Sequence, residues 1–228
     1  MVHRYVVANA GELEFERVIF FSDAVFAIAI TLLVINIRVP VRPGSAATVG
    51  QFGHGLAQQT GRILSWALSF FVVARYWMAH HTMFRFVSRF DRRLIGLNLL
   101  FLACVALLPY NAAVLAAWGD TGPGAAFYAL GMAAVGLTQG ATWFYATRRG
   151  LTVSRLSRSL GNAYLLTLLQ SPVIFLLSVP VALLLRPAVA WGLWSLIFLT
   201  RRLVSRRVLA ALDNTEAPSA GGGDRDRP

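Results

Sequence analysis

Apolar residues along this chain gather in long runs, and short polar segments separate the runs. Each run approaches 20 residues, the length at which a helix crosses about 30 Å of hydrocarbon. The pattern predicts six membrane-spanning helices, at residues 18–38, 62–82, 94–118, 124–147, 160–186 and 188–208. We therefore expect an all-α integral membrane protein that crosses the cell membrane several times.

The last two predicted spans are separated mainly by Arg186 and Pro187. This short separation leaves open a single re-entrant unit over residues 160–208, although two spans fit the length better. Pro172 and Pro180 predict kinks in the fifth helix, which membrane helices tolerate when neighbouring groups satisfy the backbone.

Polar segments flank the predicted membrane domain on both sides. Residues 1–17 are expected to form a cytoplasmic N-terminal segment, and residues 18–208 the six-helix membrane domain. Glutamates at Glu12 and Glu14 precede the first apolar run, which differs from a cleavable signal peptide. Residues 209–228 are rich in Gly, Pro, Ser and charge, so they predict a disordered cytoplasmic tail.

Composition argues against a soluble protein, because 57% of the residues are hydrophobic and only 14% are charged. Soluble domains carry about a quarter of charged residues. The net charge of +11 raises nucleic-acid binding as a candidate. However, the arginines collect in short connections without a recognition-helix pattern, so we expect a lipid bilayer and no nucleic acid as partner.

Arginines alternate strongly between the two sides of the predicted membrane domain. The sparse side holds Arg38, Arg42, Arg62 and Arg186. The rich side holds Arg4, Arg17, Arg85, Arg89, Arg92, Arg93, Arg148, Arg149, Arg155, Arg158, Arg201, Arg202, Arg206, Arg207, Arg225 and Arg227. Since cytoplasmic loops carry the excess of Arg and Lys, both termini are expected in the cytoplasm.

Asp23 is the only acidic residue inside any predicted span. A charge in hydrocarbon costs about 2.5 to 3.5 kcal/mol even on the lenient insertion scale, which makes such a residue a functional candidate. Two interpretations stay open: a hydrogen-bonding anchor between helices, or a direct part of a permeation path.

Large aliphatic residues form a stripe on the same helix. Helical geometry places Ile28, Leu32 and Ile35 within about 60° of one another, whereas Asp23 points to nearly the opposite side. Such a stripe faces either lipid or a pore, and the residues alone favour lipid.

The first span also carries a motif, R-x-x-x-F-S-D-x-x-x-A, formed by Arg17, Phe21, Ser22, Asp23 and Ala27. This motif resembles the signature of the transmembrane protein 175 family, the endolysosomal potassium channels and their prokaryotic homologues. RYWMAHHTMFRF at the end of the second span and NLLFLACVALLPY in the third are similar to further family segments. The resemblance covers roughly residues 15–115, and the six-span total agrees with the tetrameric prokaryotic members.

The resemblance implies a homotetrameric, potassium-permeable cation channel that needs no cofactor. Its pore would be lined by the first helix of each subunit, with Ile28, Leu32 and Ile35 as a hydrophobic constriction that gates and filters by dewetting. Discrimination between K⁺ and other monovalent cations is expected to be modest.

The same resemblance implies a polar network that holds the pore helices in register. It would join Arg17, Ser22 and Asp23 to Trp77 and to either His80 or His81. The alternative for the two histidines is an interfacial pair at the cytoplasmic membrane edge.

Other functions have weaker support. Residues 48–53 read TVGQFG, similar to a classical carbonyl filter, but Pro40 and Pro43 leave no room for its pore helix, so we expect a flexible extracytoplasmic loop and no P-loop filter. Enzyme motifs and metal-ligand spacings are missing from the sequence. The main rival is a proton-coupled secondary transporter with Asp23 and a histidine as relay.

Overall fold

The computed structural model describes residues 2–40, 48–154, 156–195 and 197, with side chains from residue 15 onward. Helices dominate these residues, which also contain an isolated antiparallel bridge between Val87 and Thr152. The expected all-helical fold is therefore confirmed.

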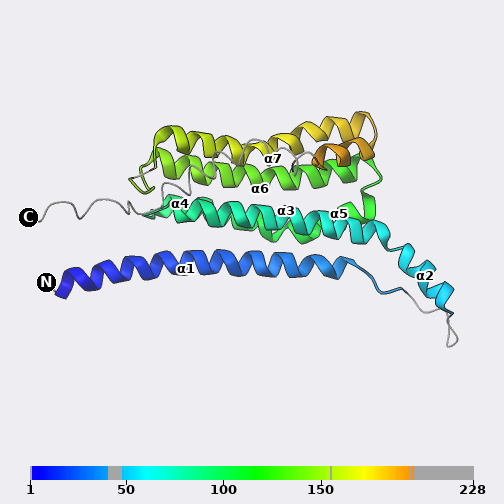
Figure 1. Cartoon of the computed structure of the whole chain (residues 1–228), viewed down its shortest axis with the longest axis horizontal. Coiled ribbons are helices and arrows are strands. Elements are labelled where there is room, and N and C mark those ends of the chain that lie inside the picture. Colours follow the sequence, from blue (N-terminus) through cyan, green and yellow to red (C-terminus); the bar gives the residue numbers. More distant parts are fainter. Residues whose placement is uncertain (1, 41–47, 155, 196, 198–228) are drawn as a thin grey trace, which may run out of the picture.

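The elements follow one another as α1 (Val2–Leu32), the 3-10 turn η1 (Leu33–Asn36), α2 (Val49–Ala57), α3 (Thr60–Arg85), α4 (Arg92–Ala106), α5 (Leu108–Trp118), α6 (Gly122–Arg148) and α7 (Arg158–Leu184). Figure 1 shows the long helices running along one common direction, with α6 and α7 on one side of the bundle and α1 at the opposite edge. Helix α1 packs against α3, α4 and α5.

Three helical stretches are long and apolar enough to cross a membrane by length and composition. Within the described residues they are Phe15–Asn36, Arg92–Trp118 and Arg158–Leu184. Helices α3 and α6, of 26 and 27 residues, coincide with the second and fourth predicted spans. Residues 187–195 are helical, and the rest of the sixth predicted span lies largely outside the described residues, as do the predicted tail and its boundary at residue 209.

Two of the predicted spans lie within helices that differ from them in detail. Helix α1 begins at Val2 and its 31 residues extend about 46 Å, whereas the apolar stretch that could cross a membrane, Phe15–Asn36, agrees with the predicted span at residues 18–38. The third predicted span agrees with the apolar stretch Arg92–Trp118, although a break at Leu107 divides it into α4, which ends at Ala106, and α5, which begins at Leu108. Pro109 explains this break, since its nitrogen has no hydrogen to donate to the preceding turn.

The segment resembling a carbonyl filter is also not the flexible loop that we expected. Residues 49–57 form helix α2, and Thr48 and Gln51 close its N-terminus with reciprocal side-chain to backbone bonds. This arrangement is a capping box, which satisfies two orphan amides at a helix start. The helical backbone turns these carbonyls along its own axis, away from any filter geometry.

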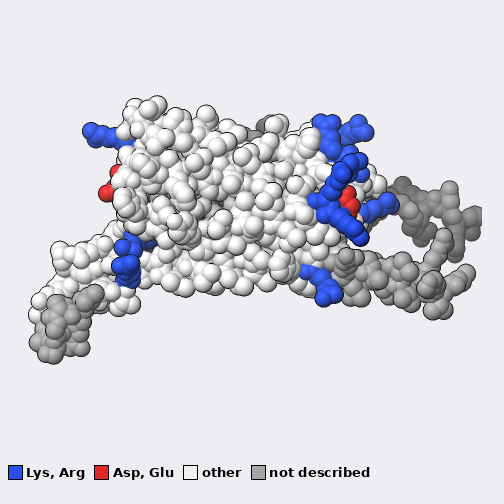
Figure 2. Space-filling view, turned by 180° about the vertical axis from the view of Figure 1, so that it is seen from behind, with Lys and Arg blue, Asp and Glu red and all other residues white. Residues whose placement is uncertain are grey.

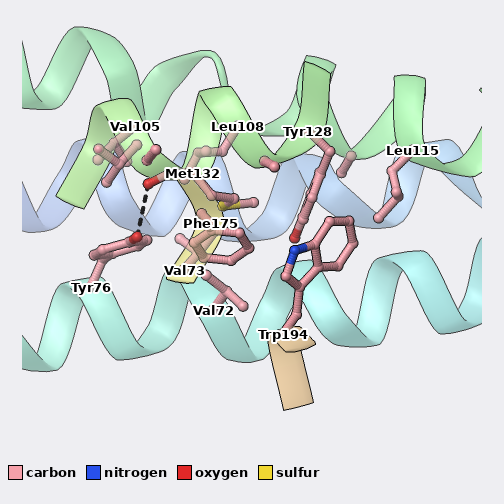
Figure 3. Close-up of a cluster of buried hydrophobic side chains, with 14 of the residues drawn as sticks. Val72, Val73, Tyr76, Val105, Leu108, Leu115, Tyr128, Met132, Phe175 and Trp194 are labelled. Atoms are coloured by element: carbon pink, nitrogen blue, oxygen red, sulfur yellow. Dashed lines mark hydrogen bonds between the residues drawn. The ribbon is translucent and has the colours of Figure 1, made fainter. Parts of the chain in front are cut away.

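The bundle core is built around aromatic side chains that carry a hydrogen-bonding group. Figure 3 shows Tyr76 on α3 donating its hydroxyl to the Met132 carbonyl on α6, at 2.8 Å. Trp194 reaches between Tyr128 and Phe175, and its Nε1 donates to Ser178 Oγ at 2.8 Å. These side chains bury a large apolar area while satisfying their polar atoms.

Charged residues gather toward the two ends of the bundle, and the surface between them is uncharged on the face drawn in Figure 2. The Val87–Thr152 bridge brings the α3–α4 and α6–α7 connections together at one end. This end carries Arg85, Arg89, Arg92, Arg93, Arg148, Arg149 and Arg158 among the described arginines. We call it the arginine-rich end.

Candidate functional site

Helix α1 has one face inside the chain and one outside. Ser22, Phe26, Ala29 and Leu33 are buried at spacings of three and four residues, which follow one side of a helix. This inner face packs against α3 and α4, and Phe26 contacts Phe101 with ring centroids 5.7 Å apart. The burial pattern thus fixes the rotation of α1 about its axis.

The opposite face of α1 contains the three aliphatic residues of the predicted constriction. Ile28, Leu32 and Ile35 expose 60%, 41% and 70% of their surface. Thus the described part of the chain leaves the stripe uncovered.

Exposed residues on α1 also repeat every seven positions. One column contains Arg17, Ala24 and Thr31. The other contains Phe21, Ile28 and Ile35, and the exposed Ala27 lies beside the first column, on the side away from Ile28. A repeat of seven is the spacing of a seam between helices, and small residues such as alanine permit close helix contacts in membranes.

Asp23 lies at the flank of α1, half-buried against α3. Its Oδ1 accepts a hydrogen bond from Trp77 Nε1 at 2.8 Å. The Trp77 ring stacks on His81, with centroids 5.7 Å apart and an interplanar angle of 29°. Asp23, Trp77 and His81 form the outer cluster, which ties α1 to α3.

A second, inner cluster is buried between α1, α3 and α4. The Ser22 hydroxyl donates to the Val18 carbonyl at 2.8 Å and accepts from Asn98 Nδ2 at 3.0 Å. Asn98 Oδ1 in turn accepts from His80 Nε2 at 3.0 Å. This chain of bonds places the ring proton of a neutral His80 on Nε2.

Aromatic rings enclose His80 on several sides. Its ring stacks on Phe101 with centroids 5.2 Å apart and an angle of 8°, and it lies 4.3 Å from the Phe84 ring. The residue is 1% exposed. A charged imidazolium is costly in such surroundings, so the packing favours a neutral, structural histidine.

The structure therefore divides the single network predicted from the sequence into two clusters. Trp77 and His81 accompany Asp23, whereas His80 reaches Ser22 through Asn98. Asn98 is the member that sequence reasoning missed. An amide inside the apolar run NLLFL was the available signal, because polar side chains in membrane helices usually bond to another helix.

Arg17 takes a different place from the one predicted. It is exposed and lines a groove between α1 and α4, together with Phe21, Asn98 and Leu99. Among the hydrogen bonds of the described residues, the two clusters are made without its guanidinium.

Metal binding finds no support in the part of the chain that the structure covers. No three His, Cys, Asp or Glu side chains there are grouped as metal ligands. From Val18 to Leu32, the chemistry available on α1 is therefore that of apolar side chains, the Asp23 carboxylate and neutral hydrogen-bonding groups.

The fold and this site define an integral membrane protein whose first helix leaves an apolar face uncovered. The sequence model of the family described as endosomal/lysosomal potassium channel TMEM175 matches residues 17–109. Residues 17–109 therefore belong to the TMEM175 family, as the resemblance indicated. The family is one of channels and not of enzymes.

Two relatives from bacteria carry the name potassium channel. The relative from Streptomyces collinus is 41% identical over 138 residues, which cover 59% of this chain and 65% of the relative. The relative from Chamaesiphon minutus is 37% identical over 111 residues, covering 49% of this chain and 54% of the relative. The chain thus spans between half and two thirds of the length of these relatives.

A solved structure matches more of the chain. It is the crystal structure of a lysosomal potassium-selective channel TMEM175 homolog from Chamaesiphon minutus, with a TM-score of 0.67 and 24% sequence identity. The match covers 86% of this chain and 98% of that one. At this identity the match establishes the fold.

Proposed function

We propose that four copies of this chain form a potassium-permeable cation channel in the cell membrane, with α1 of each copy lining the pore. The observation that carries this proposal is the uncovered apolar face of α1, which lies in the stretch matched by the channel family. The names of the bacterial relatives support potassium as the permeant ion.

The seven-residue columns supply the packing argument. Four α1 helices that contact one another through Ala24, Ala27 and Thr31 would turn Ile28, Leu32 and Ile35 toward a shared axis. The buried inner face of each α1 stays with its own bundle, so assembly needs no rearrangement within the protomer.

A ring of aliphatic side chains controls permeation because its width decides whether the passage contains water. When the ring is narrow, the passage dewets and ions cannot cross; when it widens, hydrated cations pass. The excess of arginines at the arginine-rich end supports a cytoplasmic location for that end, and with it for the start of α1.

The proposal is tested with purified protein in liposomes that carry a K⁺ gradient. We expect flux that follows the gradient, and we expect Ile28→Asn to increase it because an amide keeps the constriction wet. Leu166→Asn is the matched control, since Leu166 is exposed on α7, away from the α1 stripe. Unchanged flux in Ile28→Asn, or an equal rise in the control, would remove Ile28 from the pore.

Substitutions at Asp23 distinguish the proposed channel from the alternative, a proton-coupled transporter. Asp23→Asn keeps an oxygen that can accept from Trp77 Nε1, but its amide cannot carry a proton at neutral pH. A channel with Asp23 as an anchor keeps its K⁺ flux in Asp23→Asn and loses tetramers in Asp23→Ala. Coupled proton flux that disappears in Asp23→Asn would establish the transporter instead.

A further inference from the structure

A polar pocket lies where the α6–α7 connection meets the arginine-rich end. Its lining includes the polar side chains Thr147, Arg148, Thr152, Ser157, Arg158 and Asn162. The empty space within it, including the open mouth, is about 620 Å³. This pocket is separate from α1 and from the two clusters that hold it.

The walls of the pocket are fixed by bonds to the neighbouring connection. Val153 N donates to the Phe86 carbonyl at 2.9 Å, and Ser88 N donates to the Leu151 carbonyl at 2.8 Å. On the inner side, Trp143 Nε1 donates to the Gly161 carbonyl at 2.9 Å. The backbone of the pocket walls is therefore held in place before any ligand arrives, which lowers the entropic cost of binding.

The pocket lies at the edge of the apolar surface. Arg148 holds its guanidinium over the Phe144 ring, 5.0 Å from the centroid. Phe144 on α6 and Leu166 on α7 are both exposed, and each lies one helical turn nearer to mid-length of the bundle than the pocket residues Arg148 and Asn162. An arginine that lies along an apolar face and ends in a polar pocket is typical of the headgroup layer.

The chemistry of the lining favours an anion. Two guanidinium groups, three hydroxyls and one amide line the pocket, and its eight described lining residues include no carboxylate. Asp91, at the same end, is engaged by the Leu94 amide and the Tyr145 hydroxyl. Arginine binds phosphate oxygens through paired N–H groups, and the Ser157 hydroxyl, whose oxygen accepts from Leu160 N, retains its hydrogen as a further donor. The Thr147 hydroxyl donates instead to the Trp143 and Phe144 carbonyls.

We propose that this pocket binds the phosphate of an anionic phospholipid from the cytoplasmic leaflet. Arg148 and Arg158 contact the phosphate oxygens, and the neighbouring hydroxyl and amide groups bind the polar head. The acyl chains lie along the apolar surface of Phe144 and Leu166.

The test uses the full chain in detergent, titrated with short-chain phosphatidylglycerol or phosphatidylcholine and followed by native mass spectrometry. We expect selective binding of phosphatidylglycerol that weakens about fivefold in Arg148→Gln and in Arg158→Gln, equivalent to about 1 kcal/mol per arginine. Arg148→Lys should retain part of the binding because the charge remains. Circular dichroism verifies that each variant is folded.

Two controls define what overturns the proposal. Arg89→Gln removes an exposed arginine at the same end but outside the lining, and it should leave the lipid affinity unchanged. An equal loss in Arg89→Gln would mean that general surface charge attracts the lipid. Inorganic phosphate forms the second arm: if it displaces the lipid at equal concentration, the pocket is a free-phosphate site and the lipid assignment is wrong.

Discussion

His80 and Asp23 lie at the same helix interface but differ in burial and in hydrogen-bond partners. His80 is enclosed by rings and reaches Ser22 only through the Asn98 amide. Asp23 lies at the flank of the same interface and accepts from Trp77, whose ring remains partly exposed. The buried cluster therefore stabilises the protomer from within, and the flanking cluster lies at its surface.

Asn98→Ala tests the buried cluster. The substitution leaves His80 Nε2 and the Ser22 hydroxyl without the amide between them, and we expect a loss of about 1 to 3 kcal/mol in the free energy of unfolding. Thermal unfolding in detergent measures it. Asn162→Ala, at an exposed position on α7, is the matched control and should change little. Equal stability of the two variants would contradict a structural role for Asn98.

Asp91 makes the arginine-rich end sensitive to acid. The Tyr145 hydroxyl, at 2.7 Å from Oδ2, is the main cause that holds the pKa of Asp91 below its ordinary value, and the Leu94 amide adds to it. A depressed pKa in the folded state stabilises the protein above the unfolded pKa, about 3.9. This contribution is lost as the pH falls through the lower, folded pKa.

Tyr145→Phe removes the hydroxyl that lowers the Asp91 pKa. We expect the variant to unfold at a higher pH than the parent when the pH is lowered from 6 to 2, followed by circular dichroism. Tyr110→Phe, an exposed tyrosine on α5, provides the control and should unfold at the parental pH. If the pH of unfolding shifted equally in both variants, the change would not be due to the Asp91 pKa.

At the scale of elements, glycines decide how closely α6 and α7 approach. A Cβ added at Gly136 on α6 would lie 2.7 to 2.9 Å from ring atoms of Pro172 on α7. Both partners belong to helix interiors, and the proline ring cannot turn aside as a long side chain can. The pair therefore sets the distance between these two helices.

Gly136→Ala is expected to lower the free energy of unfolding by about 1 to 3 kcal/mol, as overpacking in a tight core does. Gly96→Ala on α4 has no neighbouring atom within 4 Å of the added Cβ. It should stabilise its helix by about 0.5 to 1 kcal/mol. Thermal unfolding of both variants gives the comparison, and a Gly136→Ala protein as stable as Gly96→Ala would contradict the close approach.

At the scale of the whole molecule, the described surface consists of an uncharged belt with exposed apolar side chains and two charged ends. The charged ends suit the two water-facing sides of a bilayer, and the uncharged belt suits its interior (Figure 2). The exposed columns on α1 combine small residues with large aliphatic ones. This combination is what a helix seam requires and what contact with lipid does not need.

Ala27→Trp tests assembly through this seam. A bulky ring at Ala27 should prevent close contact between α1 helices, so we expect a shift from tetramer to smaller species in a mass measurement in detergent. Ala141→Trp introduces the same ring at an exposed position on α6 and should remain tetrameric. A tetramer retained by Ala27→Trp would place the interface elsewhere.

The sequence by itself determined the helical membrane fold and the family of residues 17–109. Both follow from local properties: the length of apolar runs, the cost of a carboxylate in hydrocarbon and a short motif around Asp23. Local properties also led to errors, since the residues of α2 looked like a loop and Asn98 looked like one polar position in an apolar run.

The tertiary structure decided which residues meet. Asn98 and Ser22 are 76 residues apart along the chain, and their hydrogen bond depends on how α1 and α4 pack. The same packing turns one face of α1 inward and leaves Ile28, Leu32 and Ile35 outside. A hydrogen bond requires a fixed distance and direction between two groups, and only the packed helices set both.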